Sequence, residues 1–337
     1  MTTDTTVSSA PAVAAPSRSR HGGPWVVFLV RRLIRSLVAM WVIVTAAFLV
    51  LRAAGGDPVR AALGATADES VVQARREQLG LDQPLIVQYV DYLLGLLRGD
   101  LGASLITGRE VTDLVAQRMP ATLELAALSF VVILLVAVPL GLFVAILTQG
   151  GRRRGAEVAF TGVTAFIAAI PEYLLGVVLI IVFGITAHLL PVAGRGGPES
   201  YILPVAAMSI AASASIARIA RIEALATLGD DYVRTARSKR LPAALVYFRH
   251  ALPNMLTATL TIGGTMLGTM VASGVLVEQV FNWPGLGTAF VGAITAKDYG
   301  IVQGLALVYA AIILTINLIV DIVLSLLDRR TTLMETS

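Results

Sequence analysis

Residues 230–254 read DDYVRTARSKRLPAALVYFRHALPN and lie between two long apolar runs. Acidic residues open the stretch at Asp230 and Asp231, where they suit the positive end of a helix dipole. Basic residues follow as far as Arg240, and Pro242 then stops the helix. A second helical piece occupies residues 243–252. The stretch predicts a short helix–turn–helix, and residues 231–254 are called the basic segment below.

Two kinds of surface could receive the basic segment. A basic helix can lie on anionic lipid headgroups. However, the apolar face formed by Tyr232, Val233 and Ala236 is small and would bury little area in a bilayer. The pattern therefore favours docking onto another protein.

The rest of the chain is strongly apolar. Hydrophobic residues make up 56% of its 337 residues and charged residues only 14%, whereas soluble domains carry about a quarter charged residues. Six apolar stretches reach the roughly 20 residues that a membrane-spanning helix needs. We place them at residues 26–51, 123–147, 159–187, 202–222, 256–277 and 301–327. Because a spanning segment must satisfy its own backbone hydrogen bonds, we predict an all-α polytopic membrane protein with six transmembrane helices.

Basic residues predict the orientation of these spans. They gather before the first span, between the second and third, in the basic segment and after the last, for example at Arg31, Arg152, Arg237 and Arg329. Positive residues favour the cytoplasmic side. We therefore expect both termini in the cytoplasm, residues 1–24 as a disordered cytoplasmic tail, and residues 223–254 as a cytoplasmic loop.

The long loop between the first two spans, residues 53–119, is predicted to be external. It holds nine acidic residues and six arginines. Helical spacing predicts two short helices in it, one ending near Gly80 and one near Gly99. Such a cap could contact a partner or only pack on the ends of the spans.

Several classes of function find no support in the residues. There is no cysteine, and the three histidines (His21, His188 and His250) are far apart, so a thiolate or zinc centre is not expected. Neither Lys239 nor Lys297 follows a glycine, so a phosphate-binding P-loop is absent. The net charge of +4 is modest and clustered, which argues against nucleic-acid binding. We expect no enzyme activity from this chain alone.

The run YVRTARSK, followed by His250 and Asn254, resembles the cytoplasmic coupling loop of ABC importer permeases of the dipeptide, oligopeptide and nickel family. The resemblance extends over nearly all of the chain after residue 25. Its motifs include Arg31-Arg32-Leu33, Gly56-Asp57-Pro58, Gly80-Leu81-Asp82, Gly99-Asp100-Leu101-Gly102, Pro120-Ala121-Thr122-Leu123, Pro139-Leu140-Gly141, Ile170-Pro171, Leu203-Pro204, Pro284-Gly285-Leu286-Gly287, Asp298-Tyr299 and Asn317 with Asp321.

The resemblance implies a type I ABC importer permease fold, with residues 25–337 as one transmembrane permease domain. It implies a multi-pass protein of the bacterial inner membrane. Its expected partners are a second homologous permease, cytoplasmic ABC ATPase subunits and an extracytoplasmic substrate-binding protein. ATP and magnesium would bind to the ATPase, and no cofactor is expected on this chain.

The resemblance also implies which residues contact the ATPase, whereas the substrate-binding residues stay unassigned. The coupling residues expected from it are Asp231, Tyr232, Arg234, Thr235, Ala236, Arg237, Lys239, Arg240 and Leu241. The family usually has glycine at the position of Arg240. A left-handed turn there would cost about 1 kcal/mol for arginine, or the turn would be built differently.

The predicted cargo is a di- or oligopeptide. The same architecture could import nickel chelates, glutathione or sugars. An ATPase-independent secondary carrier is an alternative of another class, and the absence of an evident inverted repeat counts against it.

Charged residues in or near the spans admit two interpretations each. Asp321 could line the transport pathway or bond to a neighbouring helix. Glu172 lies near the end of a span, where a charge costs little, or it could lie near the pathway, since it follows Pro171, where a helix break is expected. Arg218 and Arg221 could reach the membrane surface or link the fourth span to the cytoplasmic loop.

Overall fold

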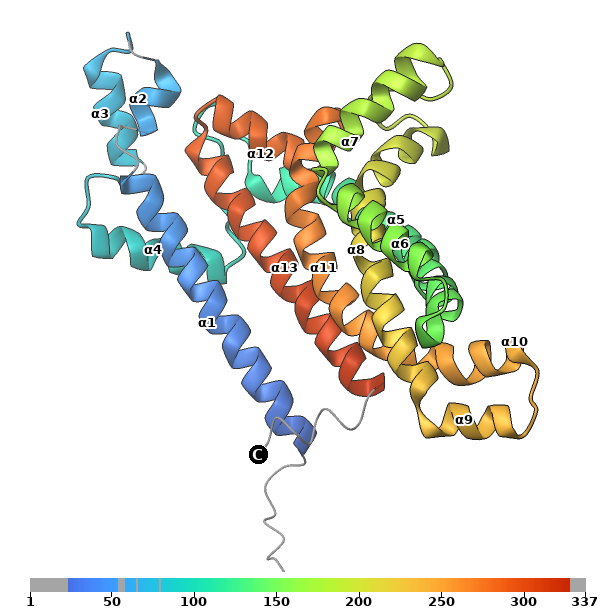
Figure 1. Ribbon diagram of the computed structural model, residues 1–337. Coiled ribbons are helices and arrows are strands. Elements are labelled where there is room, and N and C mark those ends of the chain that lie inside the picture. Colours follow the sequence, from blue (N-terminus) through green and yellow to red (C-terminus); the bar gives the residue numbers. More distant parts are fainter. Residues whose placement is uncertain (1–23, 54–57, 65, 79, 328–337) are drawn as a thin grey trace, which may run out of the picture.

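The computed structural model describes residues 24–53, 58–64, 66–78 and 80–327, which form a bundle of helices (Figure 1). All of the predicted tail except Pro24 lies outside these residues, as do Asp57, Arg329 and Arg330. Regular structure in the described ranges is helical, apart from one isolated bridge between Ala103 and Glu110.

The bounds of the helices follow the chain from end to end. They are α1 (Pro24–Ala53), α2 (Pro58–Leu63), α3 (Glu69–Gln78), α4 (Leu85–Leu97), α5 (Val111–Thr148), α6 (Arg154–Ala168), α7 (Glu172–Leu179), α8 (Ile202–Gly229), α9 (Asp231–Ser238), α10 (Ala243–Leu245), α11 (Leu252–Val280), α12 (Leu286–Thr295) and α13 (Tyr299–Leu327). Short 3₁₀ or π turns adjoin them at η1 (Gln149–Gly151), η2 (Ile180–Thr186), η3 (Pro198–Tyr201) and η4 (Val246–Ala251).

Five helices, α1, α5, α8, α11 and α13, are long and apolar enough to cross a membrane. The third predicted span, residues 159–187, is a broken one. Helix α6 ends at Ala168, and α7 starts at Glu172 after a bend of 89°. The break lies at Pro171, as the sequence predicted. Helix α5 begins at Val111, before the predicted start of the second span at residue 123, and carries Pro120 within it.

Helices α5 and α8 approach each other closely at Gly141. A Cβ atom on Gly141 would lie 2.6 Å from the Cβ of Ala220 and 2.8 Å from the carbonyl oxygen of Ala217. Small residues let membrane helices come this close, and van der Waals packing then holds them together. This contact joins the middle of the bundle to the basic segment, which follows directly from α8.

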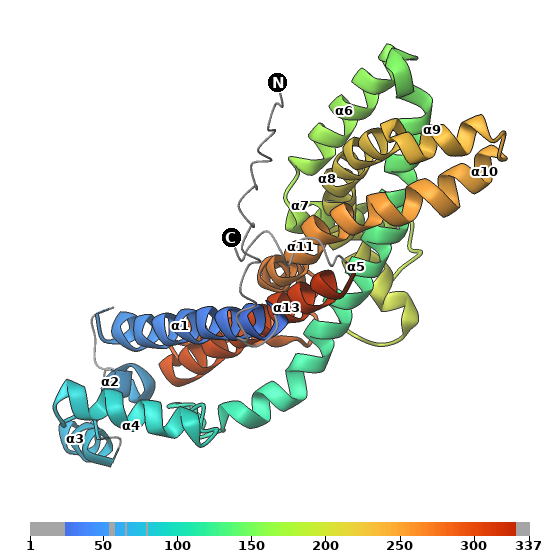
Figure 2. The same ribbon diagram turned by 90° about the horizontal axis from the view of Figure 1, so that it is seen from below.

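Helix α1 lies along α13 (Figures 1 and 2). Arg32 of α1 forms an ion pair with Asp321 of α13. This supports the interpretation of Asp321 as a link to a neighbouring helix. At the far end of α1, the ring of Phe48 packs 5.1 Å from that of Tyr89 in α4. Tyr89 and Thr45 also share a hydrogen bond of 2.6 Å.

The two ends of the bundle differ in what they carry. The basic segment lies at the lower end in Figure 1, called the basic end below, where α1 begins and α13 ends. Helices α2, α3 and α12 lie at the opposite end. Helices α3 and α4 end just before Gly80 and near Gly99, where the sequence predicted the ends of two short helices.

We predict that Gly141→Ala lowers the stability of the protein by about 2 kcal/mol, because the added methyl group must push α5 away from α8. The apparent unfolding temperature of the purified protein in detergent measures this loss. Gly162→Ala on α6 is the matched control, since a Cβ there would have no atom within 4 Å. An equal effect of both substitutions would contradict the close contact.

Candidate functional site

The basic segment forms a helical hairpin beside the bundle (Figure 1). Helix α9 continues from the end of α8 with Asp230 between them in an extended conformation. Residues 239–242 turn the chain, and α10 and η4 then lead it back into α11. The predicted helix–turn–helix is therefore present in the structure.

The apolar side of α9 packs against the chain itself. Val233 and Ala236 are buried in a cluster with residues of α5, α8 and η4, among them Leu142, Ala224 and Val246. Ala236 is only 5% exposed. The interpretation of Val233 and Ala236 as a surface for a partner is thus wrong, because α9 needs this face to attach to the bundle.

The turn after α9 has the geometry that usually takes glycine. Arg240 adopts a left-handed conformation with φ of 56°. Its N–H donates to the carbonyl oxygen of Arg237 (2.9 Å), and the N–H of Leu241 donates to that of Ala236 (3.4 Å). These two bonds form a Schellman motif, which ends a helix. The chain therefore keeps the turn and accepts the strain of an arginine in it.

The other predicted coupling residues face outward. Asp231, Tyr232, Arg234, Thr235, Arg237 and Lys239 are exposed, as is Arg240, and Leu241 is half-buried. The side chain of Arg234 is 77% exposed, so its ion pair with Asp231 contributes little to stability. Burial of its ring and the charge of Asp230 raise the pKa of Tyr232. Its neutral hydroxyl accepts a hydrogen bond of 2.9 Å from Asn254.

Polar bonds tie the hairpin and α8 to the turn between α5 and α6. Arg237 donates to the side-chain oxygen of Gln149 at 3.1 Å. Arg221 pairs with Glu157 at 2.8 Å and donates to the hydroxyl of Thr148 at 3.0 Å. Arg221 therefore links α8 to α6 and α5. Within the described residues, Arg218 makes no comparable bond.

A shallow apolar groove on the second arm of the hairpin was missed by the sequence analysis. It has a volume of about 560 Å³ and is lined by Ala244, Leu245, Phe248, Arg249 and Pro253. Phe248 is 66% exposed. The sequence feature that could have revealed this groove is Phe248 itself, an aromatic residue in a charged stretch outside the predicted spans. Phe248 and Arg234 together give the hairpin an outer surface with both apolar and basic groups.

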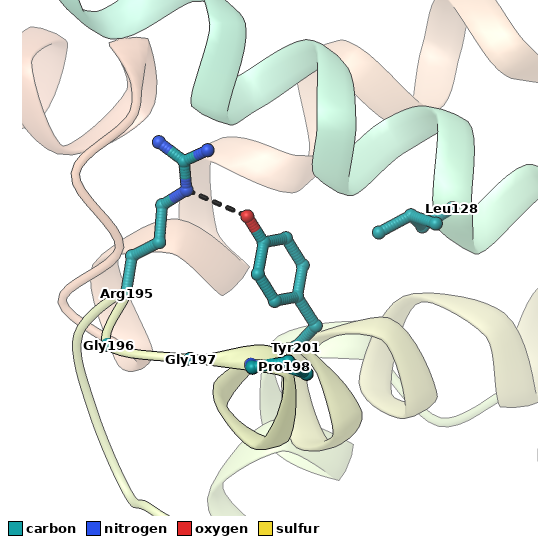
Figure 3. Close-up of a pocket in the computed structure, with 6 residues that line it drawn as sticks. All are labelled: Leu128, Arg195, Gly196, Gly197, Pro198 and Tyr201. Atoms are coloured by element: carbon teal, nitrogen blue, oxygen red, sulfur yellow. Dashed lines mark hydrogen bonds between the residues drawn. The ribbon is translucent and has the colours of Figure 1, made fainter.

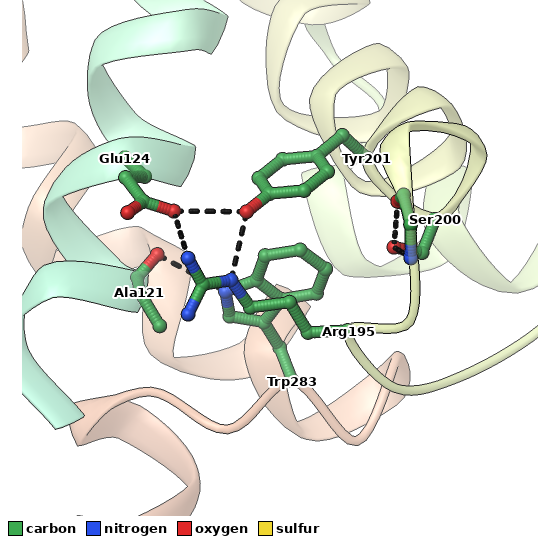
Figure 4. A network of polar contacts seen from close by, with 7 residues as sticks. Ala121, Glu124, Arg195, Ser200, Tyr201 and Trp283 are labelled. Carbon is green, nitrogen blue, oxygen red and sulfur yellow. Dashed lines mark hydrogen bonds and ion pairs between the residues drawn. The ribbon is translucent and has the colours of Figure 1, made fainter. Parts of the chain in front are cut away.

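A polar cluster occupies the opposite end of the bundle (Figures 3 and 4). Arg195 donates from Nη2 to Glu124 at 2.6 Å and from Nε to the Tyr201 hydroxyl at 2.7 Å. The Tyr201 hydroxyl donates to the same carboxylate at 2.8 Å. The Tyr201 ring meets Trp283 edge-on at 4.7 Å. Arg195 and Tyr201 line an open pocket of about 590 Å³ with Leu128 and Pro198. This cluster holds the loop before α8 against α5.

Two acidic residues at this end are buried. Glu278 accepts bonds from the Thr122 hydroxyl (2.6 Å) and the N–H of Gly287 (2.7 Å) at the start of α12. Asp298 accepts bonds from the Ser104 hydroxyl and the N–H of Leu105. Both carboxylates fix loops and do not reach the surface. Within the described residues, no group of three or more His, Cys, Asp or Glu side chains could hold a metal ion.

Residues 137–333 match the family of binding-protein-dependent transport system inner membrane components, and residues 25–126 match the N-terminal part of such membrane components. The chain belongs to this family. Among its relatives, the glutathione transport system permease protein GsiC of Escherichia coli O6:H1 is 33% identical over 296 residues, covering 88% of this chain and 95% of that protein. The probable peptide ABC transporter permease protein y4tP of Sinorhizobium fredii is 36% identical over 312 residues, covering 90% and 98%.

The solved structure of the inward-facing MetNI methionine ABC transporter shares the fold of this permease. The match has a TM-score of 0.52 and 15% identity, and covers 64% of this chain and 97% of that one. The chain is accordingly the permease subunit of a binding-protein-dependent ABC importer of the inner membrane. ATP hydrolysis belongs to a separate subunit, and a substrate-binding protein delivers the cargo. Membership in the family excludes the ATPase-independent carrier.

We predict that Arg240→Gly stabilises the permease by about 1 kcal/mol, because glycine adopts the left-handed conformation without a steric penalty. The apparent unfolding temperature should rise. The neighbouring Lys239→Gly is the control, since Lys239 has a φ of −73° and gains no such relief. A lower unfolding temperature for Arg240→Gly than for Lys239→Gly would mean that Arg240 makes a contact worth more than the strain.

Proposed function

We propose that this permease imports short peptides, with the basic segment as the joint that receives force from an ATPase. The observation that carries the proposal is the two-sided hairpin. Its inner face is buried against α5 and α8, and its outer face carries Arg234 and Phe248. A movement applied to the outer face must therefore reach the helices of the bundle.

The coupling contact is proposed for Asp231, Tyr232, Arg234, Thr235, Arg237, Lys239 and Arg240, together with the groove at Phe248. Ala236 and Leu241 contribute indirectly, because they pack against the bundle and so hold these exposed residues in place. The groove adds apolar area that a docking partner can bury, which charged residues alone do not supply.

We propose that the basic end is cytoplasmic. Arg237 of the hairpin is bonded to Gln149, next to the Arg152–Arg154 run, so two basic loops lie together. Positive residues favour the cytoplasm. Both termini then lie in the cytoplasm, and residues 53–119 form the external loop. Residues 25–337 act as one permease domain with residues 223–254 as its coupling loop.

A second, homologous permease is proposed to complete the pathway. The described residues leave large apolar side chains exposed along the spans, including Leu135 and Phe143 on α5. Lipid and a second permease can both cover such surfaces. A single bundle of this size offers half of a pathway, which the second permease would close.

The proposed cargo class rests on the relatives. The y4tP relative is named as a probable peptide permease, and GsiC as a glutathione permease. Glutathione is itself a tripeptide with one unusual linkage, so both names fit one class of cargo. Glutathione is the second candidate for this chain. Nickel chelates and sugars are not proposed, because neither of the two relatives is named for such a cargo.

The coupling role predicts the effect of the double substitution Arg234→Glu/Phe248→Ser. The complete transporter, with its ATPase, second permease and binding protein, should lose at least about tenfold in uptake, because two exposed contacts with the ATPase are removed. Stimulation of ATP hydrolysis by the loaded binding protein should fall with it. Arg98→Glu, at the end of α4, is the control for charge reversal. If the double variant keeps the wild-type rate of uptake and the wild-type stimulation of ATP hydrolysis, the proposed coupling role of these residues is wrong.

Cargo is tested by uptake into proteoliposomes that contain the same transporter. We expect uptake of a labelled tripeptide, competed by unlabelled di- and tripeptides. Glutathione uptake with no effect of ordinary peptides would select the second candidate. Uptake of a nickel chelate or a disaccharide alone would overturn the proposal of a peptide cargo.

A further inference from the structure

Helix α11 carries hydroxyl groups at every fourth residue, in a row that turns by about 40° around the helix at each step. They belong to Thr257, Thr261, Thr265, Thr269 and Ser273. All except the half-buried Thr257 are exposed. At 1.5 Å per residue the row is about 24 Å long, which is most of the thickness of the hydrocarbon core. This row is called the hydroxyl face below.

The hydroxyl face is distinct from the sides of α11 that pack on other helices. Gly264 and Gly268 meet Val320 and Asn317 of α13, and Gly274 meets Met208 of α8. The exposed part of the hydroxyl face, from Thr261 to Ser273, lies between these two packed sides. In Figure 2, α11 stands where the arm formed by α1 and α13 meets the arm formed by α6 and α7. Ser273, at one end of this face, bonds to Glu172 at the start of α7, so that end lies toward the arm of α6 and α7.

The chemistry of the hydroxyl face differs from that of a surface built for lipid. The exposed side of α5 carries Leu135, at 69% exposure, and Phe143. On α11, by contrast, Thr261 and Thr269 donate to carbonyl oxygens of their own helix at 2.8 Å. This leaves the lone pairs of their oxygens available to a passing polar group.

The carboxylate of Glu172 lies at the Ser273 end of the hydroxyl face. Glu172 lies at the break between α6 and α7 and accepts a hydrogen bond of 3.0 Å from Ser273. Ser273 is about 10 Å inside the Val280 end of its span, counted at 1.5 Å per residue. No ion pair between Glu172 and a cationic side chain occurs within the part of the chain that the structure describes. An acidic residue at membrane depth without a cationic partner is costly unless hydrogen bonds, water or a ligand stabilise it, and among the described residues Glu172 has only the bond from Ser273.

We propose that the hydroxyl face of α11 lines the cargo route and that Glu172 pairs with a cationic group of the cargo as it passes. Under the proposed function, on which the identity of the cargo rests, that group is the ammonium of a peptide. Charge complementarity selects it, because a carboxylate next to hydroxyl oxygens offers acceptors and a negative charge. Broken membrane helices commonly supply such sites.

The absence of cysteine from the sequence allows a direct test of the route. Thr261→Cys, Thr265→Cys and Thr269→Cys are introduced one at a time into the complete transporter in membranes, and variants that retain uptake are treated with small water-soluble thiol reagents. We expect labelling at all three positions. Leu135→Cys on α5 is the control, since Leu135 is also exposed in the single chain but has apolar surroundings. Labelling of Leu135→Cys alone would overturn the proposal.

The role of Glu172 has a separate readout. Thr269→Cys should react faster with a cationic reagent than with an anionic reagent of the same size. Addition of Glu172→Gln should lower that ratio by about tenfold, as expected for loss of one charge a few ångströms away in a partly dry site. Glu172→Asp should retain the ratio. If Glu172→Gln leaves this ratio of reaction rates unchanged, the Glu172 carboxylate does not lie on the route.

Uptake separates this inference from the proposed function. Glu172→Gln should lower peptide uptake, with Glu172→Asp restoring part of it. If the wild-type transporter takes up no peptide while the labelling pattern is as expected, the cargo class is wrong and the route stands. If peptide is taken up and the hydroxyl face is unlabelled, the route is wrong and the cargo class stands.

Discussion

The contact between α5 and α8 is the constraint on which the rest of the structure depends. Because Gly141 has no side chain, α8 approaches to within van der Waals distance of the α5 backbone. The small side chains of Ala217 and Ala220 on α8 permit this approach from the other side. Toward the basic end the same two helices contribute Leu142 and Ala224 to the cluster that receives Val233 and Ala236 of α9. The hairpin is thus an extension of the α5–α8 pair. Because packed interiors are dense and resist deformation, displacement of the hairpin is passed to that pair.

Charged groups hold the loops at both ends of this pair. At the basic end, Arg221 joins α8 to Glu157 of α6. At the opposite end, the carboxylate of Glu278 sits at the start of α12, where backbone N–H groups and the helix dipole favour a negative charge. These buried or half-buried bonds are made within the chain, so removing one partner leaves an unpaired group.

How much the sequence could predict depends on the kind of pattern. Span number, the break at Pro171 and the hairpin followed from apolar length and from proline, because these act locally. The sequence did not predict that Ala236 packs against its own bundle. An eight-residue amphipathic helix has the same pattern whether its apolar face packs on its own chain or on a partner. The start of α5 at Val111 did not follow from apolar length, because the first turns of this helix carry polar and charged residues. The strain at Arg240 was one of two alternatives, and only the geometry of the turn decides between them.

The hydroxyl face was hidden for a different reason. In a span, nearly all positions are apolar, so periodicity does not distinguish the side that meets lipid from the side that meets a pathway. Threonine is also tolerated in lipid, because its hydroxyl bonds to its own helix. That same property suits a transport route. A route must attract cargo enough to admit it and hold it weakly enough to release it. Hydroxyls that are already bonded offer only weak acceptors, and one carboxylate adds a single attraction. Selection among cargoes can then rest with the substrate-binding protein, while the permease provides passage.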